Sequence, residues 1–103
     1  MNEHIQKLHD QVNSLSNEVQ ASVCAKAISV LHTIPNNAPY PTIEVEGENI
    51  VIEWKTRIRF RVLCYALGYK VKMEDSPAII IEQDYQTVTS FGDIIRYYYR
   101  TQQ

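Results

Sequence analysis

A cluster of three prolines divides the chain into two parts whose apolar residues recur with different periods. In this segment, Pro35–Pro41, proline fixes the backbone and removes hydrogen-bond donors, so a helix cannot pass through it. Before it, apolar residues recur every three to four positions, as in a helix; after it they alternate, as in half-buried strands. The 103 residues therefore predict one α+β domain.

We expect four segments within that domain. A helical arm over 1–34 is followed by a proline-rich connector over 35–41, an antiparallel sheet over 42–89 and a C-terminal helix over 90–101. The sheet is expected to be a meander of four to five strands, because turn residues separate short alternating runs. The apolar run from Ala78 to Glu82 is expected to be its most buried strand.

The first helix carries an apolar seam with the spacing of a coiled coil. Its positions alternate three and four apart: Ile5, Leu8, Val12, Leu15 and Val19. One interpretation is a symmetric homodimer through this seam, and the other is an intramolecular stripe that lies on the sheet. We expect one long helix, but a break near Ser16 stays open as an alternative, with Ser16 as the cap of a second helix. At the other end of the chain, Ser90 and Asp93 predict a capping box for the last helix.

Basic residues line one face of the predicted sheet. Four alternate along one strand, and two could extend the same face from the next strand: Lys55, Arg57, Arg59 and Arg61, with Lys70 and Lys72. Such a face could bind phosphates or single-stranded nucleic acid. We favour an ion-pair lattice, because a register that places Trp54 opposite Ile58 also places Glu53 opposite Arg59. A formal net charge of −2 also lacks the basic excess of a typical nucleic-acid binder.

Tyrosines and arginines on the last helix form a second candidate surface. Tyr97, Tyr98 and Tyr99 are consecutive, so they cannot all point to one side of a helix, and we assign Tyr98 to the core. Tyrosine and arginine are enriched at the centres of protein interfaces. The residues that we expect to bind a partner combine both surfaces: Arg57, Arg59, Arg61, Arg96, Tyr97, Tyr99 and Arg100.

No residue pattern predicts catalysis, a metal site or a cofactor. Cys24 and Cys64 are far apart and each lies in an apolar pattern, which predicts free, buried thiols. His4 and His9 do not share a helix face, and His32 lies near a helix end. The polar N-terminus and the lack of a long apolar run lead us to expect a cytoplasmic protein without a membrane partner.

These observations favour a small non-enzymatic protein-binding module that inhibits or regulates another protein. A phage- or bacterium-encoded anti-defence or antitoxin-like protein would have this size and acidity. The alternative is a nucleic-acid or nucleotide-phosphate binder that uses the arginine-rich strand face. A hydrolase or transferase whose site residues converge only in space is a third hypothesis.

Overall fold

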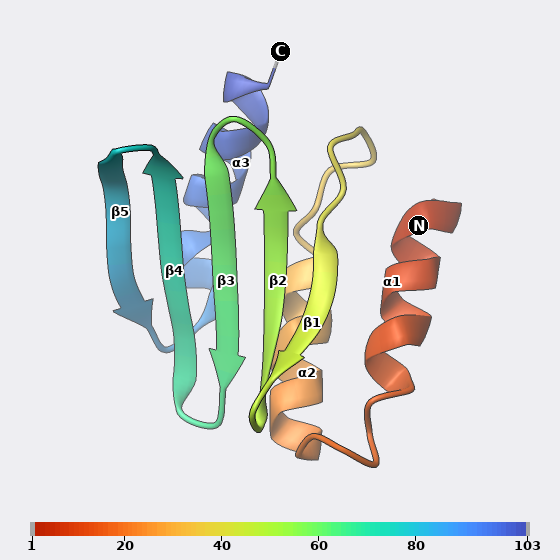
Figure 1. Cartoon of the computed structure of the whole chain (residues 1–103). Helices are drawn as coiled ribbons and strands as arrows, with labels where there is room; N and C mark the ends of the chain where they lie inside the picture. The colour runs from red at the N-terminus through yellow and green to blue at the C-terminus, as the bar shows by residue number, and fades with distance from the viewer. Residues whose placement is uncertain (1, 103) are drawn as a thin grey trace.

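Helices pack on one face of a five-stranded antiparallel sheet (Figure 1). The computed structural model describes residues 2–102. Its elements are α1 (Glu3–Asn13), α2 (Ala21–Leu31), β1 (Thr42–Glu46), β2 (Asn49–Lys55), β3 (Arg59–Tyr65), β4 (Gly68–Asp75), β5 (Ala78–Tyr85), the 3₁₀ turn η1 (Val88–Phe91) and α3 (Gly92–Thr101). The predicted α+β class is confirmed, with helices at both ends of a meander. Within the described range, no helix has the length and apolar character that crossing a bilayer requires.

The prediction of a single long N-terminal helix is wrong, because α1 and α2 are separate helices of 11 residues each. Asn2 caps α1, because its side chain accepts a hydrogen bond from the Ile5 backbone N–H at 2.8 Å. Residues 14–20 form the turn, since short serine and asparagine side chains compete with the helix for backbone hydrogen bonds. The break is therefore real, but Gln20 and not Ser16 stands at the start of α2.

The apolar seam predicted for the first helix packs within the chain's own hydrophobic core. Four of its five residues are buried, and the fifth, Leu15, is partly buried against the same core. The four buried residues are Ile5, Leu8, Val12 and Val19. Ile5, Leu8 and Val12 lie on α1, which packs against α2 and β1 beside it (Figure 1), whereas Leu15 and Val19 lie in the turn that follows. An 11-residue helix is also too short for a coiled coil of three heptads. The coiled coil is thus not supported, and side chains already buried in one chain are not available to a second copy.

The sheet is a meander in which each strand pairs with its neighbours in the sequence, in the order β1-β2-β3-β4-β5. Alternate side chains point toward α2 and α3 and form the core, as the period of two predicted. The largest fully buried ones on the strands are Trp54, Phe60, Ile50, Ile52 and Met73.

Strands β2 and β3 pair two residues out of the predicted register. Glu53 faces Arg61, whereas the predicted partner was Arg59. The turn lies one residue further along the chain than expected, at Thr56 to Ile58, where the Thr56 hydroxyl donates to the Ile58 carbonyl at 2.7 Å. Because a shift of two preserves parity, each of these side chains still lies on the predicted face.

Strand β5 is the least buried strand, so the prediction for the run from Ala78 to Glu82 is wrong. It forms one edge of the sheet (Figure 1), and Ile79 is 56% exposed. Ile80 is left out of the register with β4, which makes a bulge. A continuous apolar run marks a central strand only where layers cover both faces of the sheet, and here the outer face is open.

The opposite edge, β1, is shielded by α1, which lies beside it (Figure 1). The side-chain amide of Gln11 on α1 donates to the backbone carbonyl of Ile43 on β1 at 3.3 Å. A carbonyl that would otherwise face outward from an edge strand is thereby paired within the chain. The two edges of the sheet therefore differ in how far they are protected.

Helix α3 starts without the predicted capping box. Its first turn follows η1 directly, and Phe91 at the N-cap makes no side-chain cap hydrogen bond. Ser90 instead shares a 2.8 Å hydrogen bond with the Thr87 hydroxyl, and Asp93 pairs with Arg96. Phe91 is fully buried, so packing sets the start of this helix.

Trp54 links the sheet to α3 and to the connector. Its buried ring stacks on Phe60 with a centroid distance of 4.9 Å. Its Nε1–H donates to the Tyr99 hydroxyl at 3.0 Å, and that hydroxyl donates to the Pro39 carbonyl at 2.5 Å. A buried indole N–H needs such a partner, so this chain of hydrogen bonds fixes three segments relative to one another.

Replacing Leu8 by alanine should lower the free energy of unfolding by about 2–5 kcal/mol, because a cavity would remain beneath α1. The exposed neighbour Lys7→Ala should change it by less than about 0.5 kcal/mol. Urea unfolding followed by the fluorescence of Trp54, the single tryptophan, measures both. Light scattering should give the same mass for wild type and Leu8→Ala; a halved mass in the variant would contradict the intramolecular assignment of the seam.

Replacing Tyr99 by phenylalanine should cost about 1–3 kcal/mol of stability, since the Trp54 N–H and the Pro39 carbonyl lose their shared partner. Tyr97→Phe on the same helix is the matched control, because Tyr97 is 48% exposed and should tolerate the change within about 0.5 kcal/mol. Chemical denaturation of both variants provides the comparison. Equal losses in the two would show that the hydrogen-bond chain contributes nothing specific.

Candidate partner-binding surface

The face of the sheet that points away from the helices, here called the outer face, is not covered by any element of the described chain (Figure 1). It carries charged side chains of both signs, with five cations and six carboxylates: Lys55, Arg59, Arg61, Lys70 and Lys72, with Glu44, Glu46, Glu53, Glu74, Glu82 and Asp84. One row of side chains crosses four strands in the order Glu53, Arg61, Lys72, Glu82. The surface is thus mixed in charge and close to neutral.

Most of the predicted phosphate-binding cations already have an acidic partner. Lys55 lies 3.2 Å from Glu44, and Arg61 pairs with Glu46. Lys72 lies 4.0 Å from Glu74 and 3.9 Å from Glu82, so it bridges two strands. These pairs are partly or fully exposed, and each contributes only about 0–1 kcal/mol to stability.

Three more of the predicted residues differ in their environment. Arg57 lies in the turn between β2 and β3, where its guanidinium is 3.8 Å from Asp75 and 82% of its side chain is exposed. Among residues 2–102, no carboxylate lies within 4.0 Å of the cationic groups of Arg59 or Lys70. Arg59 and Lys70 are therefore the outer-face cations most available to an external acidic group.

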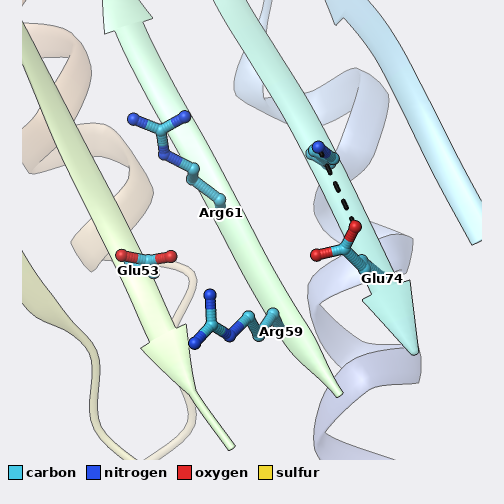
Figure 2. A pocket seen from close by; sticks show the side chains of 5 residues that line it. Glu53, Arg59, Arg61 and Glu74 are labelled. Carbon is cyan, nitrogen blue, oxygen red and sulfur yellow. Dashed lines mark ion pairs between the residues drawn. The ribbon is translucent and has the colours of Figure 1, made fainter. Parts of the chain in front are cut away.

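A hollow of about 280 Å³ lies on the outer face between β2 and β4. Figure 2 shows that Arg59 and Arg61 both extend from β3 toward β2, with Glu53 between the levels of their guanidinium groups. Glu74 and Lys72, joined as an ion pair, line the opposite side. We call these five residues the charged hollow: Glu53, Arg59, Arg61, Lys72 and Glu74.

An apolar cluster adjoins the charged hollow and was missed by the sequence analysis. Leu63 and Tyr65 point outward from β3, and Leu67 lies at the two-residue turn into β4 with 82% of its surface exposed. With Ala66 they line a hollow of about 490 Å³ whose polar rim includes Lys70. We call Leu63, Tyr65, Ala66 and Leu67 the apolar cluster. A leucine at a hairpin tip, where polar residues are usual, is the signal that could have revealed it.

The predicted residues on α3 do not join this surface. α3 packs on the inner face, so Arg96, Tyr97 and Arg100 lie on the opposite side of the sheet from Arg59 and Arg61 (Figure 1). Tyr97 is exposed, and Arg96 and Arg100 border a hollow of about 250 Å³ beside the connector.

Tyr99 is only 3% exposed and its hydroxyl is occupied by Trp54 and Pro39. Its expected role in partner binding is therefore replaced by a structural one. Tyr98 is fully buried, as predicted, and shares a 2.6 Å hydrogen bond with the Thr56 hydroxyl.

The thiols are not placed for chemistry at the surface. Cys24 and Cys64 are free and buried, as predicted. Burial raises the pKa of the Cys64 thiol to about 12, although Lys26 slightly opposes this rise. A thiol with that pKa is protonated at neutral pH and is a poor nucleophile. Within residues 2–102, no group of three or more histidine, cysteine or acidic side chains is arranged to hold a metal ion.

No protein-family model, curated protein sequence or solved structure matches the chain.

Proposed function

We propose that this protein is a non-enzymatic protein-binding module whose outer face binds a partner protein and thereby inhibits or regulates it. The observation that carries the proposal is the exposed apolar cluster beside the charged hollow on an uncovered sheet face. Specific protein interfaces combine an apolar centre with a polar rim. A single exposed leucine is ordinary, but a contiguous cluster of outward-facing apolar side chains is informative, and Leu67 belongs to such a cluster. A partner surface covered by this face would be closed to other ligands.

The ion pairs on the outer face support the same proposal. Arg61 and Lys72 are only partly exposed, and both are paired with acids within the chain, so their side chains are restrained before a partner arrives. Preorganised side chains lose less conformational entropy on binding. A fixed arrangement of charges of both signs also selects a partner with a complementary pattern and repels others.

A photo-crosslinking amino acid in place of Leu67 should capture the partner from a lysate of the source organism. The same amino acid in place of Ala25, an exposed residue of α2 on the other side of the molecule, is the control. Mass spectrometry of the crosslinked product identifies the captured protein. Capture through position 25 and not through position 67 would contradict binding at the outer face.

With the captured partner purified, Leu67→Asp should weaken binding at least about tenfold, because an apolar anchor becomes a charge that must be desolvated. Arg59→Glu should also weaken it, whereas Lys7→Glu on α1 should leave the affinity unchanged. All three residues are exposed, so their replacement should change stability by less than about 0.5 kcal/mol. Unchanged affinity of Leu67→Asp would remove the apolar cluster from the interface.

The second candidate function is binding of nucleic acid or a nucleotide phosphate. It is favoured by Arg59 and Lys70, which have no carboxylate within 4.0 Å among residues 2–102. It is disfavoured by the six carboxylates on the same face, which would repel a phosphate backbone.

Fluorescence anisotropy with labelled single-stranded oligonucleotides distinguishes the two functions. If the protein-binding proposal is correct, oligonucleotides should bind only non-specifically. Their dissociation constant at physiological salt should then be about 10⁻⁶ M or larger. Arg59→Glu should change it little. Tighter binding that falls steeply with salt and disappears in Arg59→Glu would establish the phosphate-binding function instead.

A further inference from the structure

Two histidines from different helices meet at the surface of the helical layer. His9 lies on α1 and His32 is the C-cap of α2, 23 positions later in the chain. Their Nε2 atoms are 3.5 Å apart, and the rings stand nearly perpendicular, at 88°, with centroids 5.4 Å apart. His9 is partly exposed and His32 exposed, so both nitrogens are reachable from solvent.

The separation of the two nitrogens suits a shared metal ion better than a direct hydrogen bond. Hydrogen bonds from N–H groups are usually about 2.7–3.2 Å long, so 3.5 Å is long for one between the rings. Two imidazole nitrogens bound to one tetrahedral Zn²⁺, each about 2.0–2.1 Å from it, lie about 3.3–3.4 Å apart. A shift of a few tenths of an ångström in either side chain would bring the pair to that distance.

We propose that His9 and His32 together bind one divalent transition-metal ion, for which Zn²⁺ is the probe, between α1 and α2. Imidazole nitrogen is a ligand for zinc, copper and nickel, whereas calcium and magnesium prefer oxygen. Within residues 2–102 no third histidine, cysteine or acidic side chain completes the set, so the remaining positions of the ion are open to water. The sequence did not reveal the pair because its members are far apart in the chain.

Such an ion would bind the folded chain in preference to the unfolded one. The two ligands come together only when α1 packs on α2, which depends on the buried side chains of the seam. A ligand that binds only the native state raises its stability in proportion to the logarithm of the ligand concentration. The ion would therefore hold the N-terminal helix against the rest of the molecule.

The test is thermal unfolding of the untagged full-length chain with increasing Zn²⁺, in parallel with His9→Ala, His32→Ala and His4→Ala. Saturating Zn²⁺ should raise the Tm of the wild type by about 5 °C or more. Because each variant is compared with its own metal-free Tm, a small loss of stability from the substitution does not affect the result. His9→Ala and His32→Ala should lose the shift, and His4→Ala should keep it, since the His4 ring stacks on Tyr40 away from the pair, with centroids 4.1 Å apart.

Isothermal titration of the same proteins with Zn²⁺ should give one ion per chain for the wild type and at least a tenfold weaker affinity for either histidine variant. A wild-type Tm that does not respond to Zn²⁺, or an equal response in all four proteins, would overturn the proposal. These results do not depend on the partner protein, so the metal site and the proposed function stand or fall separately.

Discussion

The hydrogen-bond chain from Trp54 through Tyr99 to the Pro39 carbonyl is the contact on which the arrangement of the layers depends. Trp54 is fully buried in the middle of the core, and its indole N–H would be costly there without an acceptor. Tyr99 supplies that acceptor from a helix 45 positions further along the chain. The same contact fixes the rotation of α3 and therefore directs Tyr98 onto the sheet beside Phe60, with ring centroids 5.2 Å apart.

With the helices held on one side, the outer face is left to its own side chains. Val51 points outward yet is only 2% exposed, because its neighbours across the strands cover it. Long charged side chains can cover apolar surface with their methylene groups, so a charged face need not be a loosely ordered one. The outer face thus combines partly covered apolar atoms with the exposed apolar cluster that includes Leu67.

Periodicity predicted the fold well where burial is one-sided. The alternation after the proline cluster placed β1 to β4 and their faces correctly, and Ile43 pairs with Ile52 in the first hairpin as that pattern requires. In the second hairpin the predicted register was wrong, but the predicted faces were right, because a turn displaced by one residue moves the pairing by two. The break in the first helix was indicated by its serine and asparagine content, but the position of the cap was not.

The sequence was less informative wherever the answer depends on neighbours that are distant in the chain. The seam of α1 has the same spacing whether its partner is a second copy or α2, so spacing alone could not decide between them. The run from Ala78 to Glu82 is apolar enough for a central strand, yet the chain ends its meander there. Tyr97 and Tyr99 are chemically identical, and only the rotation of α3 makes one exposed and the other internal. The apolar cluster likewise arises from a turn that brings Leu67 beside β3.

The unequal edges of the sheet limit how molecules of this protein can join through their strands. A free strand can extend another sheet by backbone hydrogen bonds, and a sheet with two free strands can grow without end. Here β5 is, among the described residues, the edge strand without a neighbouring helix, because α1 lies along β1 and the Gln11 side chain donates to a backbone carbonyl of β1. Strand-to-strand joining through β5 would therefore use the one edge strand that no helix of the described chain borders and would stop at two molecules, because α1 covers the other edge of each sheet.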